Sequence, residues 1–167
     1  QWYGEAADDG YAPAQYEIGL MFHRGEALPK SDTDAFSWFQ KAAEQGHVGA
    51  QYNLGVMYTY GYGTPINYSK AVEWFQKAAE QGSVHGQFNL ATMYDNGQGV
   101  PINYTKALEW YYKSAQSGFS EAQLNLGAMY NKGKGVPVNH AKALEWYYKA
   151  AEQGNPIAQY NIGTMYY

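Results

Sequence analysis

Apolar positions recur along this chain with a period of 36 residues. The segment AQYNLGVMY at 50–58 returns in modified form at 86–94, 122–130 and 158–166, and a degenerate copy stands at 14–22. All five tryptophans and all five methionines follow the same shift. A fixed period of roughly 20 to 50 residues is typical of a solenoid, in which each unit packs only on its neighbours.

Each period predicts a first helix followed by a Gly-Pro loop. In the copy at 47–82, the first helix is predicted over residues 48–60. Its apolar positions have the i, i+4, i+7, i+8 spacing of one helical face: Ala50, Leu54, Met57 and Tyr58. Gly61 supplies the left-handed residue that ends such a helix.

A second helix is predicted after the loop, with Asn67 as its N-cap. Asn103, Asn139 and Ser31 occupy the same slot, and these residue types favour helix N-termini. The apolar face of this helix carries Ala71, Trp74, Phe75 and Ala78. Glu-to-Lys pairs at i, i+4 are expected on its outer side: Glu73–Lys77, Glu109–Lys113 and Glu145–Lys149.

A small residue lies in the middle of every first helix. The slot holds Gly19, Gly55, Ala91, Gly127 and Gly163. A mid-helix glycine costs about 1 kcal/mol relative to alanine, so close packing of the second helix is the expected reason. The bulky tryptophan of the second helix is expected to fill the space, which makes Trp74 and Trp110 predicted core residues.

The periodicity predicts one array over residues 1–167. Residues 1–10 match the end of a second helix, full repeats cover about 11–46, 47–82, 83–118 and 119–154, and residues 155–167 match a partial first helix. We expect the chain to be a piece of a longer array. Its ends, Trp2–Tyr3 and Ile162–Met165 with Tyr167, carry no polar capping unit, which predicts weak end-to-end self-association.

The whole chain resembles the Sel1-like repeat, a relative of the tetratricopeptide repeat. The resemblance rests on AQYNLGVMY together with the GxGVPxN loop and KALEWYxKAAEQG. It implies a right-handed superhelix of antiparallel helix pairs that serves as an adaptor or scaffold for other proteins. Some cysteine-rich members join each helix pair with a disulfide and have been linked to β-lactam binding, but this chain has no cysteine.

Catalytic, cofactor and metal signatures are missing from the sequence. The histidines His23, His47, His85 and His140 occupy unrelated slots, and the interpretation for His47 is helix capping. The glycine loops lack the lysine and the strand-turn-helix context of a phosphate loop. The expectation is therefore a non-enzyme without cofactor or metal.

Charge and hydropathy limit the classes of partner that the chain is expected to bind. The net charge of −4 argues against nucleic acid, because RNA-reading repeats need a basic stripe. No apolar run approaches the ~18 residues of a membrane span. Residues 1–46 hold eight acidic and three basic side chains. A solvated face is the favoured interpretation of that segment, and attraction of a basic partner is the alternative.

A surface on the first helices remains as the candidate binding site. By resemblance to tetratricopeptide units it lines the concave groove. Several of its slots vary between copies, which is typical of a binding surface and equally of positions that merely tolerate substitution. We call this surface the first-helix face: Tyr52, Asn53, Val56, Tyr60, Phe88, Asn89, Thr92, Leu124, Asn125, Lys132, Tyr160 and Asn161.

Two alternatives stay open at this surface. The row of asparagines either holds the backbone of an extended peptide or bonds turns within the array, and the second interpretation is favoured. The row of glutamines (Gln15, Gln51, Gln87, Gln123 and Gln159) is interpreted as structural. The predicted function is a protein-interaction scaffold that binds a protein or peptide. The alternative is a carbohydrate or cell-wall binder using the tyrosine- and amide-rich groove.

Overall fold

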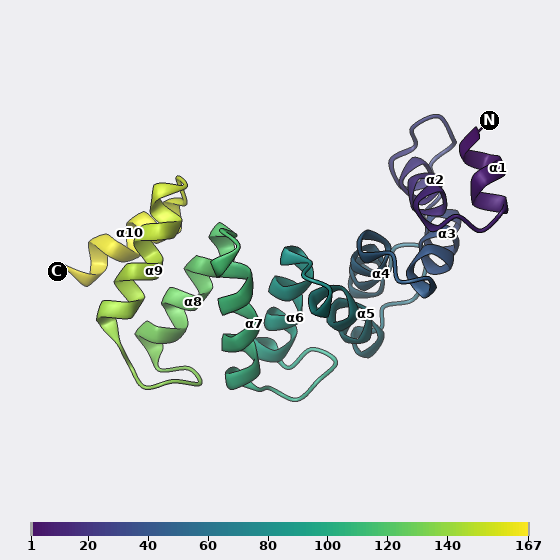
Figure 1. Cartoon of the computed structure of the whole chain (residues 1–167). Coiled ribbons are helices and arrows are strands. Elements are labelled where there is room, and N and C mark those ends of the chain that lie inside the picture. The colour runs from purple at the N-terminus through teal and green to yellow at the C-terminus, as the bar shows by residue number, and fades with distance from the viewer. Residues whose placement is uncertain (1, 167) are drawn as a thin grey trace. The chain divides into compact units, whose positions relative to one another are not determined.

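The computed structural model describes the backbone of residues 2–166 and the side chains of residues 4–166. This part of the chain contains ten helices and no strand (Figure 1). The helices are α1 (Trp2–Asp8), α2 (Ala12–Arg24), α3 (Asp32–Glu44), α4 (Val48–Tyr60), α5 (Tyr68–Glu80), α6 (Val84–Asn96), α7 (Tyr104–Gln116), α8 (Ser120–Lys132), α9 (His140–Glu152) and α10 (Pro156–Met165). The predicted all-α class is confirmed.

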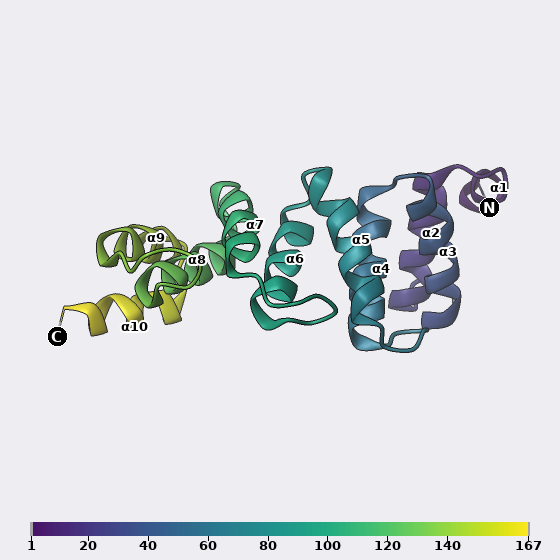
Figure 2. The same ribbon diagram turned by 90° about the horizontal axis from the view of Figure 1, so that it is seen from below.

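The chain divides into two compact units, Gln1–Gly86 and Gln87–Tyr167. In the N-terminal unit, α2, α3, α4 and α5 pack one against the next, and they lie side by side in both views (Figures 1 and 2). In the C-terminal unit, α7, α8, α9 and α10 contact their chain neighbours in the same way. Each unit is therefore a stack of helix pairs with local contacts.

The helix ends lie where the sequence predicts them. Gly61 follows α4 with φ 75° and donates its N–H to Met57 O, so the left-handed C-terminal residue is confirmed. Asn67 caps α5 by accepting from the Lys70 N–H at 3.0 Å. Ser31, Asn103 and Asn139 cap α3, α7 and α9 in the same manner. Local capping chemistry thus sets the boundaries of the repeat.

An aromatic ring of the second helix fills the mid-helix slot, and that ring is not the tryptophan. A Cβ on Gly55 would lie 2.5 Å from the Phe75 ring, and one on Gly127 would lie 2.6 Å from the Tyr147 ring. Phe39 occupies the slot at Gly19 in the same way. The expectation that the tryptophan needs this space is wrong, because the residue after each tryptophan points at the first helix.

The tryptophans lie beside the core rather than in it. Trp74 and Trp110 are half-buried, so their prediction as core residues is wrong, whereas Trp146 is only 7% exposed. The lysine three residues later covers the indole of both Trp74 and Trp110, with Lys77 Nζ 4.1 Å and Lys113 Nζ 3.9 Å from the ring centroids.

The predicted Glu-to-Lys pairs form only in part. Within residues 4–166, only the pair Glu145–Lys149 is present among the three, at 3.0 Å. Cation–π contact with the indole therefore takes the place of an ion pair for the lysines of α5 and α7.

The buried glutamines tie successive elements together, as the sequence predicts. Gln51 donates to Ala43 O at 3.2 Å and accepts from Gln81 Nε2 at 2.7 Å. Gln123 repeats this pattern with Ala115 O and Gln153. Gln51 and Gln123 thus each join the end of one second helix to the end of the next, which is a structural role.

His47 caps α4, which confirms its interpretation. Its Nδ1 accepts a hydrogen bond from the Ala50 N–H at 3.2 Å, and its ring stacks on Tyr16 with centroids 4.4 Å apart. Burial lowers the pKa of His47, while the carboxylate of Glu17 acts in the opposite direction. The cap requires the neutral imidazole, because a protonated Nδ1 has no lone pair to accept the bond.

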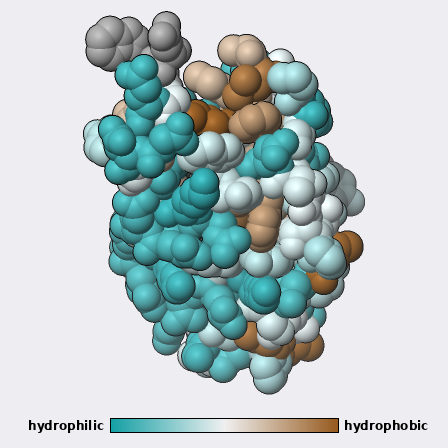
Figure 3. Space-filling view, turned by 90° about the vertical axis from the view of Figure 1, so that its right-hand side faces the viewer, coloured by the Kyte–Doolittle hydropathy of each residue, from teal (hydrophilic) through white to brown (hydrophobic). Residues whose placement is uncertain are grey.

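The surface at the N-terminal side of the molecule is largely hydrophilic. Figure 3 shows hydrophilic residues over most of this face, with apolar residues in smaller patches toward its edges. The acidic composition of residues 1–46 agrees with a solvated face here. Of the predicted apolar ends, the side chains of Trp2, Tyr3 and Tyr167 lie outside the described residues.

The aromatic ring in the mid-helix slot predicts that a larger side chain at the slot glycine destabilises the fold only where such a ring is present. Gly127→Leu drives a side chain into the Tyr147 ring and is expected to lower the free energy of unfolding by about 1–3 kcal/mol. Gly163→Leu is the matched control, because a Cβ there meets nothing within 4 Å. Urea unfolding followed by circular dichroism measures both. Equal destabilisation by the two substitutions would contradict the insertion of the Tyr147 ring at Gly127.

The glutamine row predicts a loss of stability on removal of one amide. Gln123→Leu leaves Ala115 O and Gln153 without their shared partner in a site only 5% exposed. The expected cost is about 1–3 kcal/mol, measured by urea unfolding. The exposed Gln76→Leu on α5, which loses only a bond to Glu80, is the control and is expected to cost less than about 0.5 kcal/mol.

The His47 cap predicts a pH-dependent stability. The lowered pKa means that the unfolded chain takes up a proton near pH 6.5 before the folded chain does. The contribution of His47 is therefore complete above about pH 6.5 and is lost as the pH falls below that value. His47→Asn keeps a capping side chain, as Asn155 does for α10. Its unfolding free energy is expected to fall less between pH 7.5 and 5.5 than that of the parent, and parallel profiles for the two proteins contradict the assignment.

Candidate functional site

The predicted first-helix face lies on α4, α6, α8 and α10, and none of its members is buried. Tyr60, Lys132 and Tyr160 are exposed, and the other nine are half-buried. Four members fall in the N-terminal unit and eight fall in the C-terminal unit. Each unit therefore carries its own portion of the surface.

The aromatic members of the face are held in place by neighbouring rings. The Tyr52 ring lies 6.0 Å from Phe75 and 5.8 Å from His85, centroid to centroid. Phe88 lies 5.7 Å from Tyr111. Leu124, one repeat further on, packs against the core cluster of α9 and α10. These side chains are pre-positioned, so a ligand that meets them costs little side-chain entropy.

The asparagines of the row do not all have the same partners. In the C-terminal unit, Asn125 bonds the Tyr111 hydroxyl and Asn161 bonds the Tyr147 hydroxyl. Burial raises the pKa of Tyr111, and the bonds with Thr92 and Asn125 oppose that rise. These two asparagines therefore bond within the array, as the favoured interpretation expects, but their partners are tyrosine hydroxyls of the second helices and not turns.

Asn53 in the N-terminal unit differs from them. The ring at the corresponding place is Phe39, which has no hydroxyl. Within residues 4–166 the Asn53 amide makes no hydrogen bond, and the residue is half-buried. Its donor and acceptor groups are open to a ligand.

A pocket of about 200 Å³ opens on the first-helix face of the C-terminal unit. Asp95 from the end of α6, Lys134 from the loop after α8, and four residues of α8 line it: Asn125, Ala128, Met129 and Lys132. Asn125 and Lys132 were predicted, whereas Asp95 and Lys134 were missed. The missed pair forms an ion pair at 2.8 Å, and Asp95 raises the pKa of Lys134.

The same slots in the N-terminal unit carry aromatic residues. Tyr60 corresponds to Lys132, and Tyr62 corresponds to Lys134. Their rings stack with centroids 5.7 Å apart and are 63% and 42% exposed. Two equivalent positions thus present aromatic rings at the end of α4 and lysines at the end of α8.

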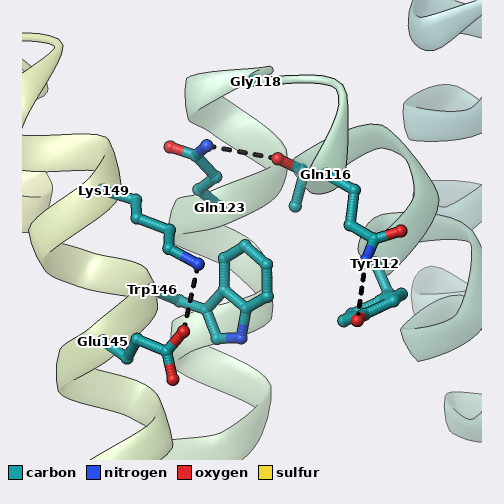
Figure 4. A pocket seen from close by; sticks show the side chains of 8 residues that line it. Tyr112, Gln116, Gly118, Gln123, Glu145, Trp146 and Lys149 are labelled. Carbon is teal, nitrogen blue, oxygen red and sulfur yellow. Dashed lines mark hydrogen bonds and ion pairs between the residues drawn. The ribbon is translucent and has the colours of Figure 1, made fainter.

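A larger pocket of about 580 Å³ lies between α7 and α9 of the C-terminal unit. Figure 4 shows Trp146 and Lys149 facing Tyr112 and Gln116, with Gln123 at the edge. The polar groups bond one another: Lys149 to Glu145 at 3.0 Å and Gln116 to the Tyr112 hydroxyl at 2.7 Å. Lys149 Nζ also covers the Trp146 ring at 4.2 Å. The polar groups of this pocket are thus paired with one another.

In the part of the chain that the structure describes, no three His, Cys, Asp or Glu side chains converge as metal ligands would. No helix found there has the length and apolar character needed to cross a bilayer.

Similar solved structures share this architecture. A protective antigen of uropathogenic Escherichia coli strains with an SLR fold superposes with a TM-score of 0.97 at 42% identity, over 99% of this chain and 36% of that one. This chain thus spans about a third of that protein's length. A Sel1 repeat protein from Oxalobacter formigenes matches at 36% identity with a TM-score of 0.88, over 100% of this chain and 66% of that one.

A third structure is more distant. Cysteine-rich protein B of Helicobacter pylori matches at 27% identity with a TM-score of 0.61, over 80% of this chain and 96% of that one. No curated protein matches the sequence.

The family model for the Sel1 repeat matches five consecutive segments, at residues 12–47, 48–83, 84–119, 120–155 and 156–167. These segments cover nearly the whole chain and agree with the helix pairs described above. The predicted resemblance and the solenoid fold are confirmed, and the chain belongs to the Sel1 repeat family.

Proposed function

We propose that this Sel1 repeat chain is a non-enzymatic scaffold that binds an extended segment of a partner protein on its first-helix face. Sel1 repeats are generally protein-interaction scaffolds. The observation that carries the proposal is the contrast between slots. The core slots keep their residue types from repeat to repeat, whereas slots of the face change from Tyr60 to Lys132, or from Phe88 to Leu124, on the same backbone.

The geometry of the C-terminal unit suits a short extended segment. Neighbouring helices pack about 8–10 Å apart, so the three first helices α6, α8 and α10 offer a path of about 20 Å. This length corresponds to about six residues of extended chain. Along the path lie Phe88, Leu124 and Tyr160, which are members of a single row. Large apolar side chains in such rows tend to act as anchors for a partner.

The binding face is tested by cross-linking. The chain serves as bait in a lysate, and the captured partner is treated with a lysine-reactive cross-linker and examined by mass spectrometry. Cross-links are expected at Lys132 and Lys134, next to the first-helix face. Lys113 and Lys149 on the second helices are internal controls in the same unit. Cross-links confined to the second helices contradict the proposal.

The energetic test uses the most exposed member of the row. Tyr160→Ala is expected to weaken the binding of the captured partner by about 2 kcal/mol, which is roughly thirtyfold in affinity, because an aromatic anchor is lost. The melting temperature is expected to stay nearly unchanged, because Tyr160 is 71% exposed. Titration calorimetry and thermal melts measure the two quantities.

The matched control is Tyr148→Ala on α9, a tyrosine 45% exposed on a second helix of the same unit. It is expected to leave affinity unchanged. If the parent and Tyr160→Ala bind the partner with equal affinity, the proposal that this row anchors the partner is wrong. Binding to a glycan array with no protein partner supports the carbohydrate alternative instead.

A further inference from the structure

From the pocket lined by Asp95, Asn125, Lys132 and Lys134, we infer that the scaffold recognises an acidic side chain, a glutamate, of its partner segment. This inference rests on the proposed function, because it places the partner segment on the first-helix face. It adds the chemistry of one residue that the segment carries.

The charges in the pocket favour an anion. Two lysines and one aspartate line it, in a chain whose formal net charge is −4. Lys132 makes no ion pair within residues 4–166. Lys134 has three N–H donors, and its hydrogen bond to Asp95 uses one of them. A carboxylate entering the pocket therefore meets donors on both lysines without breaking the existing ion pair.

The pocket is also organised before a ligand arrives. Lys134 Nζ lies 2.8 Å from Asp95 and 4.8 Å from the centroid of the Tyr104 ring, so two contacts fix a side chain that is otherwise flexible. Asp95 acts as a positioning residue, since it holds Lys134 across the pocket. Fixing a lysine in advance removes part of the entropy cost of binding.

The size and walls of the pocket favour glutamate. A volume of about 200 Å³ exceeds what a bare carboxylate fills. Ala128 and Met129 of α8 supply an apolar wall, against which the two methylenes of a glutamate side chain can pack. Lys132 and Lys134 then donate charge-assisted hydrogen bonds to the carboxylate, and these bonds provide the specificity.

The N-terminal unit provides an internal contrast. At the positions of Asp95, Lys132 and Lys134, counted 72 residues earlier, it carries His23, Tyr60 and Tyr62, so it has neither of the two lysines. Because the backbone of the repeat is the same, any preference of the C-terminal unit for an acidic ligand comes from these side chains.

The test begins with a random library of about twelve-residue peptides displayed on phage with their C-termini blocked by the coat protein. The parent chain and the double variant Lys132→Met, Lys134→Met are used as targets. Parent-selected peptides are expected to share a glutamate at a fixed place, and peptides selected on the double variant are expected to lack it. A second library with free C-termini separates side-chain from terminal carboxylates, and enrichment in that library alone overturns the inference.

Synthetic versions of the selected peptide, acetylated and amidated at the ends, then quantify the contact by fluorescence anisotropy. Replacing the peptide glutamate by glutamine is expected to weaken binding about tenfold or more. Lys132→Met or Lys134→Met is expected to do the same, and to abolish the difference between the two peptides. Lys134→Arg is expected to restore binding because it keeps the cation.

Lys113→Met is the matched control, since it removes the same charge from the outer side of α7 in the same unit. It is expected to leave both peptide affinities unchanged. If the glutamate and glutamine peptides bind the parent equally while Tyr160→Ala still abolishes binding, the glutamate inference fails and the scaffold proposal stands. If Tyr160→Ala has no effect on any selected peptide, the proposed face itself fails.

Discussion

The structure of each repeat depends on one contact, the insertion of an aromatic ring of the second helix into the small-residue slot of the first. At Gly55 the Phe75 ring comes so close that no side chain larger than hydrogen fits without a shift. A glycine in mid-helix weakens that helix, and the burial of a whole ring compensates for it. The contact fixes the rotation of the second helix about its own axis. That rotation turns the adjacent tryptophan aside, where a lysine covers it.

The same contact links the core to the binding face. Where the inserted ring is a tyrosine, its hydroxyl reaches the first-helix face and bonds Asn125 or Asn161. Where the ring is Phe39, no hydroxyl arrives, and the Asn53 amide keeps its bonding capacity. A phenylalanine-to-tyrosine exchange in the core thus changes what the surface can offer a ligand. Asn53 and Asn125, two members of the same row, consequently differ in their hydrogen bonds.

Much of this architecture is predictable from the sequence because it depends on local signals. The N-caps Asn67 and His47 and the left-handed Gly61 act within a few residues of their own position, so the period and the capping rules place the helices. The choice between Trp74 and Phe75 is different. Neighbouring residues on a helix point about 100° apart, and both are apolar, so composition cannot say which one faces the first helix.

The binding surface was predictable only where its residues stand one period apart. Asn125 and Lys132 were predicted because each belongs to a row of equivalent positions that recurs every 36 residues. The ion pair between Asp95 and Lys134 joins residues 39 apart, from different slots of successive repeats, so a comparison of copies at fixed spacing passes over it. Contacts of this kind depend on the stagger between neighbouring repeats, which the packing of the helices sets and the period does not.

The repeat separates the requirements of folding from those of recognition. The ring slot, the buried glutamines and the caps use core positions and helix ends, so they leave the last turn of the first helix and the loop after it free to vary. Tyr60 with Tyr62, and Lys132 with Lys134, occupy these free positions on equivalent backbones. A substitution at an exposed slot costs little stability, whereas it changes the chemistry that a partner meets. The selectivity of such a scaffold therefore resides in side chains that contribute least to its fold.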